Sequence, residues 1–171
     1  VAKNPEIDII VELIGGTTVA FELVMLALEN GKHVVTANKA LIAEHGMKIF
    51  ALAESRGLMV CYEAAVAGGI PIIKALREGL SANRVNWLAG IINGTTNFIL
   101  SEMDTKGREF ADVLGEAQAK GYAEADPTFD VEGIDASHKL AILASIAFSM
   151  PLSLDGLFTD GITQLEPQDV A

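Results

Sequence analysis

The residues best suited to chemistry lie in one segment, GYAEADPTFDVEGIDASHK, which runs from Gly121 to Lys139. Its carboxylates are Glu124, Asp126, Asp130, Glu132 and Asp135. We do not expect this many acids to pack into a core, because an unpaired charge is costly to bury. They can instead hold a charged polar substrate beside the ammonium group of Lys139. This segment is therefore the predicted chemical centre of the chain.

Asp135 and Lys139 are four residues apart, so they share one face of a predicted helix, with the acid on the N-terminal side. A surface ion pair worth about 0.3–0.5 kcal/mol is the simpler interpretation. The surrounding sequence, IDASHKLAILASIAF, is apolar nearly all round, which predicts a mostly buried helix. The pair is then expected to face a cavity, where a partly buried lysine can donate a proton near neutral pH. His138 lies on another face and is interpreted as packing.

Two further features follow predicted strands. Gly15 and Gly16 end the first strand; they let a ligand approach the backbone, and the next helix offers N–H groups to an anion. An ordinary tight turn is the alternative. Lys39 follows the second strand in HVVTANKA and is expected at the carboxyl edge of the sheet, where open α/β sheets bind ligands. The alternative is a solvated lysine in the first helical turn, where it opposes the helix dipole.

Glu63 ends the third predicted strand in YEAAVAGGIP. With the main-chain carbonyls of Val66 and Gly68 it could form an oxygen cage for a hard cation. A glutamate that simply accepts hydrogen bonds from loop amides fits the sequence equally well. The single cysteine, Cys61, excludes an intramolecular disulfide and a multi-cysteine zinc site, and we interpret it as a small buried hydrophobe.

The elements that position these residues begin with strands expected at 7–13, 33–36 and 58–62, alternating with helices at 18–30 and 40–56. The first strand, IDIIVEL, is almost continuously apolar, as in a parallel strand covered on both faces. This alternation at short spacing predicts an α/β fold with right-handed crossovers and a parallel sheet.

After Glu63 the pattern changes to helices at 71–80, 95–106, 109–120 and 134–148, with one strand at 85–92. We place a domain boundary near Gly69. Residues 1–68 are expected to be the C-terminal part of a Rossmann-type dinucleotide-binding domain, and 69–171 an α+β substrate-binding and dimerisation domain. The first strand reads as mid-sheet without a preceding G-x-G-x-x-G turn, and LEPQDVA reads as the opening of another element. An internal fragment is therefore expected.

Composition excludes several classes of function. The 171 residues are 50% hydrophobic and carry 23 acidic against 12 basic side chains, a formal net charge of -11. Such a chain repels nucleic acid and anionic lipid, and the basic residues are scattered. No apolar stretch reaches the roughly 18 residues that would span a bilayer, and no signal peptide opens the chain. We expect a soluble cytoplasmic protein with no membrane or nucleic-acid partner.

Taken together, five segments resemble homoserine dehydrogenases: VELIGG, VVTANKALIA, YEAAVAGGIPIIKAL, GIINGTTNFIL and GYAEADPTFDVEGIDASHKLAIL. They cover most of the chain in the family's order, and the short VTANKALIA form resembles the monofunctional type rather than aspartokinase fusions. The resemblance implies NAD(P)-dependent interconversion of L-aspartate 4-semialdehyde and L-homoserine, on the route to threonine and methionine. It also implies a homodimer.

The resemblance assigns roles to individual residues. Cofactor contacts are expected from Gly15, Gly16 and Lys39. Glu124 matches the glutamate that binds the substrate amino group, and Asp135 a second carboxylate on the substrate side. Lys139 matches the proton donor. The predicted catalytic residues are Lys139, Asp135 and Lys39. A sodium or similar monovalent cation is expected at Glu63, Val66, Gly68 and Ile70.

Two other hypotheses stay open on the sequence alone. One is a related NAD(P)-dependent oxidoreductase acting on another small amino-acid-like substrate, although paired carboxylates at 124 and 135 favour an amino acid. The other is a non-catalytic folding or dimerisation fragment that binds no cofactor. Titration with NAD(P)H distinguishes the second hypothesis from the enzyme.

Overall fold

A computed structural model describes residues 1–170. The chain divides into two compact units, each formed from two stretches of sequence. The first unit comprises Val1–Leu88 and His138–Asp155, and the second comprises Ala89–Ser137 and the segment from Gly156 onward. This division into units does not test the predicted domain boundary near Gly69, which stays a prediction.

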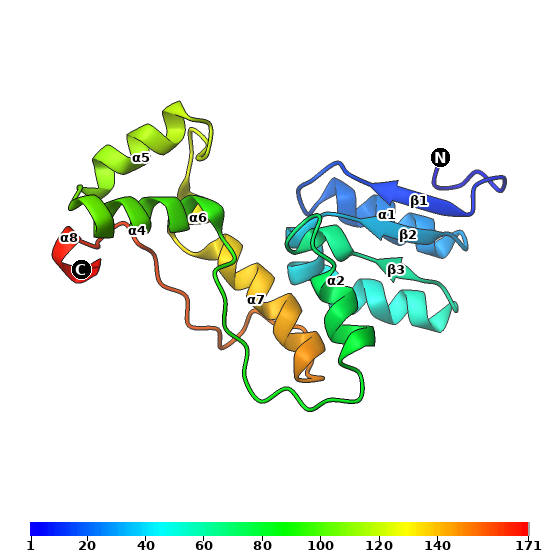
Figure 1. Ribbon diagram of the computed structural model, residues 1–171. Helices are drawn as coiled ribbons and strands as arrows, with labels where there is room; N and C mark the ends of the chain where they lie inside the picture. Colours follow the sequence, from blue (N-terminus) through cyan, green and yellow to red (C-terminus); the bar gives the residue numbers. More distant parts are fainter. Residues whose placement is uncertain (171) are drawn as a thin grey trace. The chain divides into compact units, whose positions relative to one another are not determined.

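A parallel three-stranded sheet organises the first unit (Figure 1). Its strands β1 (Ile9–Glu12), β2 (His33–Thr36) and β3 (Val60–Cys61) lie in chain order. Helices α1 (Val19–Glu29) and α2 (Lys39–Ser55) connect them. The predicted α/β alternation is confirmed, although β1 and β3 are shorter than the expected 7–13 and 58–62.

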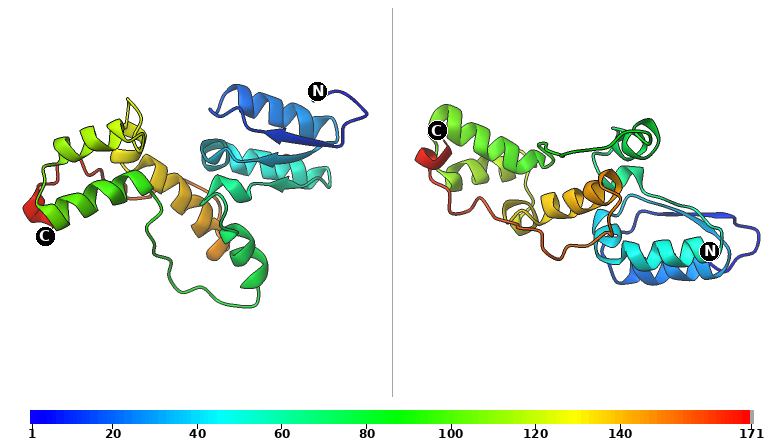
Figure 2. Two further views of the ribbon diagram at one scale, coloured as in Figure 1. Left: turned by 45° about the horizontal axis from the view of Figure 1, so that its top comes forward. Right: turned by 90° about the horizontal axis from the view of Figure 1, so that it is seen from below.

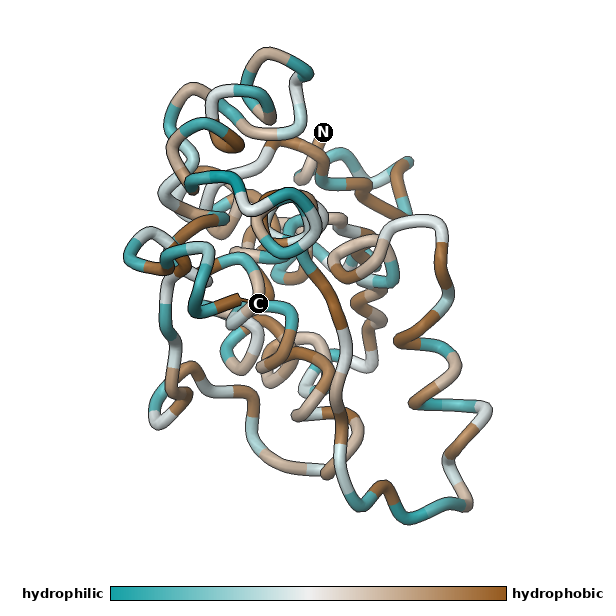
Figure 3. The backbone as a smooth tube through the Cα atoms, turned by 60° about the vertical axis from the view of Figure 1, so that its left-hand side comes forward, coloured by the Kyte–Doolittle hydropathy of each residue, from teal (hydrophilic) through white to brown (hydrophobic). Residues whose placement is uncertain are grey.

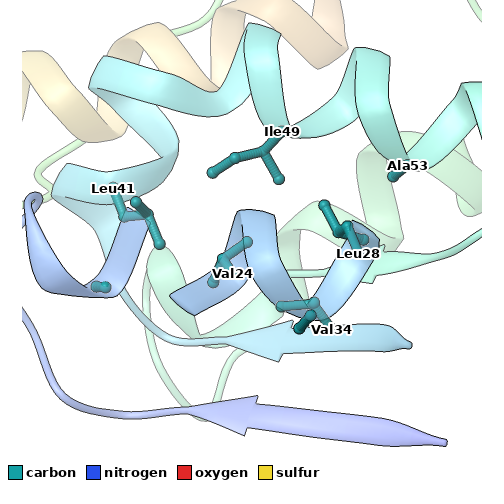
Figure 4. Close-up of a cluster of buried hydrophobic side chains, with 8 residues drawn as sticks. Val24, Leu28, Val34, Leu41, Ile49 and Ala53 are labelled. Atoms are coloured by element: carbon teal, nitrogen blue, oxygen red, sulfur yellow. The ribbon is translucent and has the colours of Figure 1, made fainter. Parts of the chain in front are cut away.

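Both connecting helices cover the same face of this sheet (Figures 2 and 4). The core on that face includes Val24 and Leu28 of α1, Val34 of β2, and Leu41 and Ile49 of α2, all fully or almost fully buried. The strands follow one another across the sheet in the order β1-β2-β3, and crossovers between parallel strands are right-handed. Both connecting helices therefore lie on the same face of the sheet.

The opposite face of the sheet is open in the described chain. Val11 of β1 is 61% exposed and Ile9 is 55% exposed. The expectation that this apolar strand is covered on both faces is therefore wrong for residues 1–170. An apolar run predicts a parallel strand correctly, but it cannot specify which faces the rest of a chain will cover.

The segment after β3 contains short helical turns. A 3-10 turn at Glu63–Ala65 is followed by α3 (Ile72–Lys74) and a π-helical turn at Ala75–Gly79. The latter two are contiguous, so the single helix expected at 71–80 is confirmed over 72–79, with its second part π-helical. The π turn is closed by the Leu80 amide, which donates to the Ala75 carbonyl at 2.9 Å.

The strand expected at 85–92 is wrong, because this segment has no regular secondary structure. Its Trp87 and Ile91 are 76% and 79% exposed. A sequence such as VNWLAGII has high strand propensity, yet a strand exists only where a neighbouring edge accepts its hydrogen bonds. The sheet of the described residues is limited to β1, β2 and β3.

Helices build the second unit. Helix α4 (Gly94–Lys106) is followed by α5 (Phe110–Ala119), and the expected bounds of both are confirmed within one residue. Two short helices, α6 (Thr128–Val131) and α8 (Pro167–Val170), complete it; α6 lies inside the acid-rich segment and was not expected. The core contains Ile99, Met103, Val113 and Val131.

A partly exposed cluster of ion pairs joins α4 to α5. Arg108 reaches Glu102 at 3.2 Å and Glu116 at 2.5 Å, and Lys120 contacts Glu116 at 2.6 Å. Hydrogen bonds from Lys120 and then Arg108 lower the pKa of Glu116 from its ordinary value of 4.5 to about 2. The cluster supports the helical pair from its solvent side.

Helix α7 (Ile134–Ala147) contributes its first turn to the second unit and its remainder to the first. In the first unit, Leu152 lies against Gly46 of α2, where an added Cβ would come within 2.7 Å of the leucine Cδ2. Hydrophobic and hydrophilic stretches are interspersed along the whole backbone (Figure 3). Among the described residues, none of the helices has the length and apolar character needed to cross a membrane.

Candidate functional site

The loop after β1 has the conformation that its two glycines permit. Gly15 and Gly16 have φ values of +81° and +70°, in the left-handed region that favours glycine. A Cβ added at either position would meet no atom within 4 Å, so one side of the loop is open. The backbone is therefore accessible from that side, and cofactor binding by Gly15 and Gly16 stays a prediction.

One amide of this loop points inward, which limits the predicted anion contact. The Gly15 N–H donates to Oε1 of Glu12 at 3.1 Å, and the Glu12 side chain is almost fully buried. The sequence interpretation missed Glu12. An available signal was its position as a single acid inside the apolar run IDIIVEL, where a charge needs partners to be buried.

Asn38 connects the glycine loop to the start of α2. Its Oδ1 accepts from the Leu41 amide at 3.1 Å, the usual contact of an N-cap asparagine, and its Nδ2 donates to the Gly16 carbonyl at 2.7 Å. The next residue, Lys39, begins α2 and is half-buried. The structure thus places Lys39 just beyond the carboxyl end of β2, as expected, with the glycine loop tied to the residue beside it.

The Glu63 carboxylate is bound to the start of α3. Its two oxygens accept from the amides of Ile73 and Lys74, both at 2.9 Å. The amide-binding alternative is therefore observed. Each carboxylate oxygen has a second lone pair, so Glu63 still fits a cation held mainly by main-chain oxygens.

The other residues predicted for the cation, Val66, Gly68 and Ile70, lie in a loop that turns sharply. Ala67 and Gly69 in this loop have φ values of +50° and +87°. Among residues 1–170, no group of three or more His, Cys, Asp or Glu side chains could hold a metal ion. A cation at this loop would therefore depend on carbonyl oxygens.

In the second unit, one amide group holds two of the predicted acids. Nδ2 of Asn93 donates to Oδ1 of Asp130 at 2.7 Å and to Oδ2 of Asp135 at 2.9 Å. Its Oδ1 accepts from the Thr96 amide at 2.8 Å, at the start of α4. Because the carboxylates accept and the backbone amide donates, only one orientation of the Asn93 amide satisfies all three contacts.

This arrangement corrects the expectation that the acid-rich segment stays out of the core. Asp135 is only 5% exposed. Burial is tolerated because Asn93 supplies a hydrogen bond to the carboxylate. The sequence interpretation missed Asn93, which lies in the motif GIINGTTNF; an asparagine before a helical pattern was the available signal of a cap.

Glu124 lies on a loop whose backbone is anchored and whose side chain is exposed. The Glu124 carbonyl accepts from Nε2 of Gln118 at 3.1 Å, and the Tyr122 carbonyl accepts from Oγ1 of Thr95 at 2.7 Å. Helices α4 and α5 thereby fix this loop. The carboxylate itself is left accessible to a ligand.

Lys139 lies on α7 one helical turn after Asp135, as the spacing predicted, and it is half-buried. His138 is buried, in agreement with its interpretation as a packing residue. Lys139 belongs to the first unit, whereas Glu124 and Asp135 belong to the second. The chemical roles of all three stay predictions at this point.

Comparison with known proteins decides the family. A family model described as homoserine dehydrogenase matches residues 71–171, and one described as the NAD binding domain of homoserine dehydrogenase matches residues 1–63. The first of these alone covers more than half of the chain. The chain belongs to the homoserine dehydrogenase family.

Curated relatives and solved structures in the homoserine dehydrogenase family agree with this assignment. A homoserine dehydrogenase of Pseudomonas aeruginosa is 74% identical over 99% of this chain, and one of Bacillus subtilis is 47% identical over 100%. The crystal structure of a Thiobacillus denitrificans homoserine dehydrogenase matches 99% of the chain with a TM-score of 0.96 and 67% identity.

A hyperthermophilic archaeal homoserine dehydrogenase in complex with NADPH matches 92% of this chain, with a TM-score of 0.82 and 31% identity. The chain spans 39% of the Pseudomonas protein and 40% of the Bacillus protein. It likewise covers 39% of the Thiobacillus structure and 48% of the archaeal one.

Proposed function

We propose that this chain carries cofactor- and substrate-binding residues of an NAD(P)-dependent homoserine dehydrogenase. The reaction is the reduction of L-aspartate 4-semialdehyde to L-homoserine, in the cytoplasm, for threonine and methionine biosynthesis. The observation that carries the proposal is the family match over 1–63 and 71–171, which includes Gly15, Gly16, Lys39, Glu124, Asp135 and Lys139.

The chemistry of the substrate fits the acidic residues. An amino acid brings an ammonium group, and a carboxylate is its natural partner. The exposed Glu124, on a loop anchored by α4 and α5, binds this ammonium group. Asp135, whose carboxylate is oriented by Asn93, contributes the second negative charge.

Lys139 acts as the general acid. When bound, the nicotinamide supplies a hydride to the aldehyde carbon. The oxygen of that carbon then needs a proton, which the Lys139 ammonium group donates. The open glycine loop with Lys39 at the carboxyl ends of β1 and β2 fits one part of the cofactor, since ligands bind at this edge in open α/β sheets.

The test is steady-state kinetics of the full-length protein. Lys139→Ala is expected to lower kcat about 10²- to 10⁴-fold, the usual contribution of a general acid, with the NAD(P)H dissociation constant unchanged. The matched control is Lys48→Ala, which removes an exposed lysine of α2 and should leave kcat unchanged. An unchanged kcat in Lys139→Ala would contradict the assignment.

Glu124→Gln separates substrate binding from catalysis in the same assay. It is expected to raise KM for the amino-acid substrate about tenfold or more, because the neutral amide binds an ammonium group less strongly than the carboxylate does. The control is Glu109→Gln, at an exposed glutamate that precedes α5 and makes no capping contact. A KM within twofold of the wild type would remove Glu124 from the binding site.

A monovalent cation and a homodimer complete the proposal. The cation is held by Glu63 with main-chain oxygens of Val66, Gly68 and Ile70. Its test is the melting temperature of the full-length protein when sodium chloride is replaced by choline chloride. A lower value in choline is expected, and equal values would contradict the site. Light scattering tests the dimer by its mass.

A further inference from the structure

The buried carboxylate of Glu12, the last residue of β1, is hydrogen-bonded to the start of the glycine loop. Oε1 accepts from the Ile14 amide at 2.7 Å and from the Gly15 amide at 3.1 Å. The side chain is 3% exposed. A buried carboxylate persists only with such donors, so the turn of the chain after Glu12 and the burial of Glu12 depend on each other.

The second oxygen of Glu12 reaches the neighbouring strand. Oε2 accepts from Oγ1 of Thr36 at 2.6 Å, and Glu12 and Thr36 are partners in the parallel register of β1 and β2. The Thr36 hydroxyl has a single proton, which is committed to Glu12. Its oxygen can therefore accept from the Asn38 amide, and it does so at 2.9 Å.

Asn38 closes the network. Its Nδ2 donates to the Gly16 carbonyl at 2.7 Å. A continuous path then runs from Glu12 through Thr36 and Asn38 to Gly16, and back through Gly15 to Glu12. Glu12 thus accepts hydrogen bonds from the Ile14 and Gly15 amides of the loop, and Asn38, which caps α2, donates to the Gly16 carbonyl.

We propose that Glu12 is a positioning residue for the cofactor-binding loop, acting through Gly15 directly and through Thr36 and Asn38 indirectly. It sets the left-handed turn at Gly15 and Gly16 and holds it against the residue before Lys39. This inference rests on the proposed function for the statement that the loop binds NAD(P)H. The positioning of the loop itself is independent of it.

A positioning role differs in a measurable way from a purely stabilising one. If the network only stabilises the fold, disrupting it lowers the melting temperature like any core mutation. If it positions the loop, cofactor affinity falls more than stability alone accounts for, while KM for the amino-acid substrate is unaffected. Restoring the hydroxyl should then restore affinity.

The experiment uses the full-length protein in four variants: Thr36→Val, Thr36→Ser, Glu12→Gln and Ile49→Val. Thr36→Val keeps the shape and removes the hydroxyl, whereas Thr36→Ser keeps the hydroxyl. Glu12→Gln replaces an acceptor by a donor opposite Thr36. Ile49→Val is the control for stability, since Ile49 is fully buried in the core of the same unit and is outside the network.

Thr36→Val and Glu12→Gln should raise the NAD(P)H dissociation constant about tenfold, the loss expected when one hydrogen bond to a charged group no longer orders the site. Thr36→Ser should stay within threefold of the wild type. Ile49→Val should lower the melting temperature with no change in the dissociation constant. Equal dissociation constants in wild type, Thr36→Val and Glu12→Gln would overturn the positioning role.

Hydrogen exchange of the Ile14 and Gly15 amides provides the readout that does not depend on a cofactor. Thr36→Val should accelerate exchange at both amides, whereas Ile49→Val should affect them no more than the rest of β1. Unchanged exchange in Thr36→Val overturns the inference. A wild-type protein that binds no NAD(P)H would instead refute the proposed function, with the exchange data still deciding what Glu12 does.

Discussion

Asn38 in the first unit and Asn93 in the second perform the same task at the start of a helix and different tasks beyond it. Each accepts a hydrogen bond from a backbone amide through Oδ1: Asn38 from Leu41 at 3.1 Å and Asn93 from Thr96 at 2.8 Å. Each also donates through Nδ2. Asn38 donates to one neutral carbonyl, that of Gly16, whereas Asn93 donates to two carboxylates.

The difference shows how one residue type can join a helix end to two kinds of candidate site. In the first unit the second partner of Asn38 is a neutral backbone carbonyl of the glycine loop. In the second unit the partners are charged side chains, one of them the buried Asp135. Hydrogen bonds to ionised groups are roughly twice as strong as neutral ones, so the second unit should be the more sensitive.

Within this comparison, the largest expected effect is that of Asn93→Asp in the full-length protein. Aspartate caps a helix as well as asparagine does, so α4 should keep its cap. The new carboxylate would, however, face the carboxylates of Asp130 and Asp135. Losing a hydrogen bond to a charged group costs about 1.5–3 kcal/mol, which predicts a rise of about 10- to 100-fold in KM for the amino-acid substrate. A KM within twofold of the wild type would break the comparison.

The same change at Asn38 should have a smaller effect of another kind. In Asn38→Asp the cap of α2 is again kept, but the contact to the neutral Gly16 carbonyl becomes repulsive. A neutral hydrogen bond is worth about 1 kcal/mol, which predicts a three- to tenfold rise in the NAD(P)H dissociation constant. Fluorescence titration measures it, with KM for the amino-acid substrate as the internal control. The ranking would be reversed if the dissociation constant of Asn38→Asp rose by a larger factor than the KM of Asn93→Asp.

The smallest effect is expected from the partly exposed ion pairs that join α4 to α5, which contrast with the buried Asp135 of the same unit. The pKa of Glu116 is about 2 in the folded protein and ordinarily 4.5, so ionised Glu116 stabilises the fold. This stabilisation is fully present above pH 4.5 and is lost as the pH falls toward 2. Solvent and salt screen such pairs, so the contribution is small.

Melting temperatures of wild type and Glu116→Gln between pH 7 and pH 2 test this expectation. The difference between the two proteins should be constant down to about pH 4.5 and should then shrink. Raised salt should shrink it at neutral pH as well. A difference that grows on acidification would contradict the assigned direction of the pKa shift.

Much of the fold could be predicted because its signals are local. Gly31 and Gly57 follow α1 and α2 closely, and both have positive φ values, as helix-ending glycines do. The prediction of a strand at 85–92 was wrong. Strand propensity is a local signal, but a strand also needs a neighbouring strand to pair with, and the sequence does not identify one. Residue types alone could not reveal that Glu63 would bind the amides of Ile73 and Lys74.

The sequence by itself determined where strands and helices alternate, that Lys39 follows a strand, and that Asp135 and Lys139 share one helix, because periodicity and helix-end residues act within a few positions. The tertiary structure alone decided the partners of the polar side chains. Glu12 meets Thr36 across 24 residues, and Asn93 meets Asp130 and Asp135 across 37 and 42. Such contacts form only once the backbone has brought distant segments together, and burial then makes each hydrogen bond necessary.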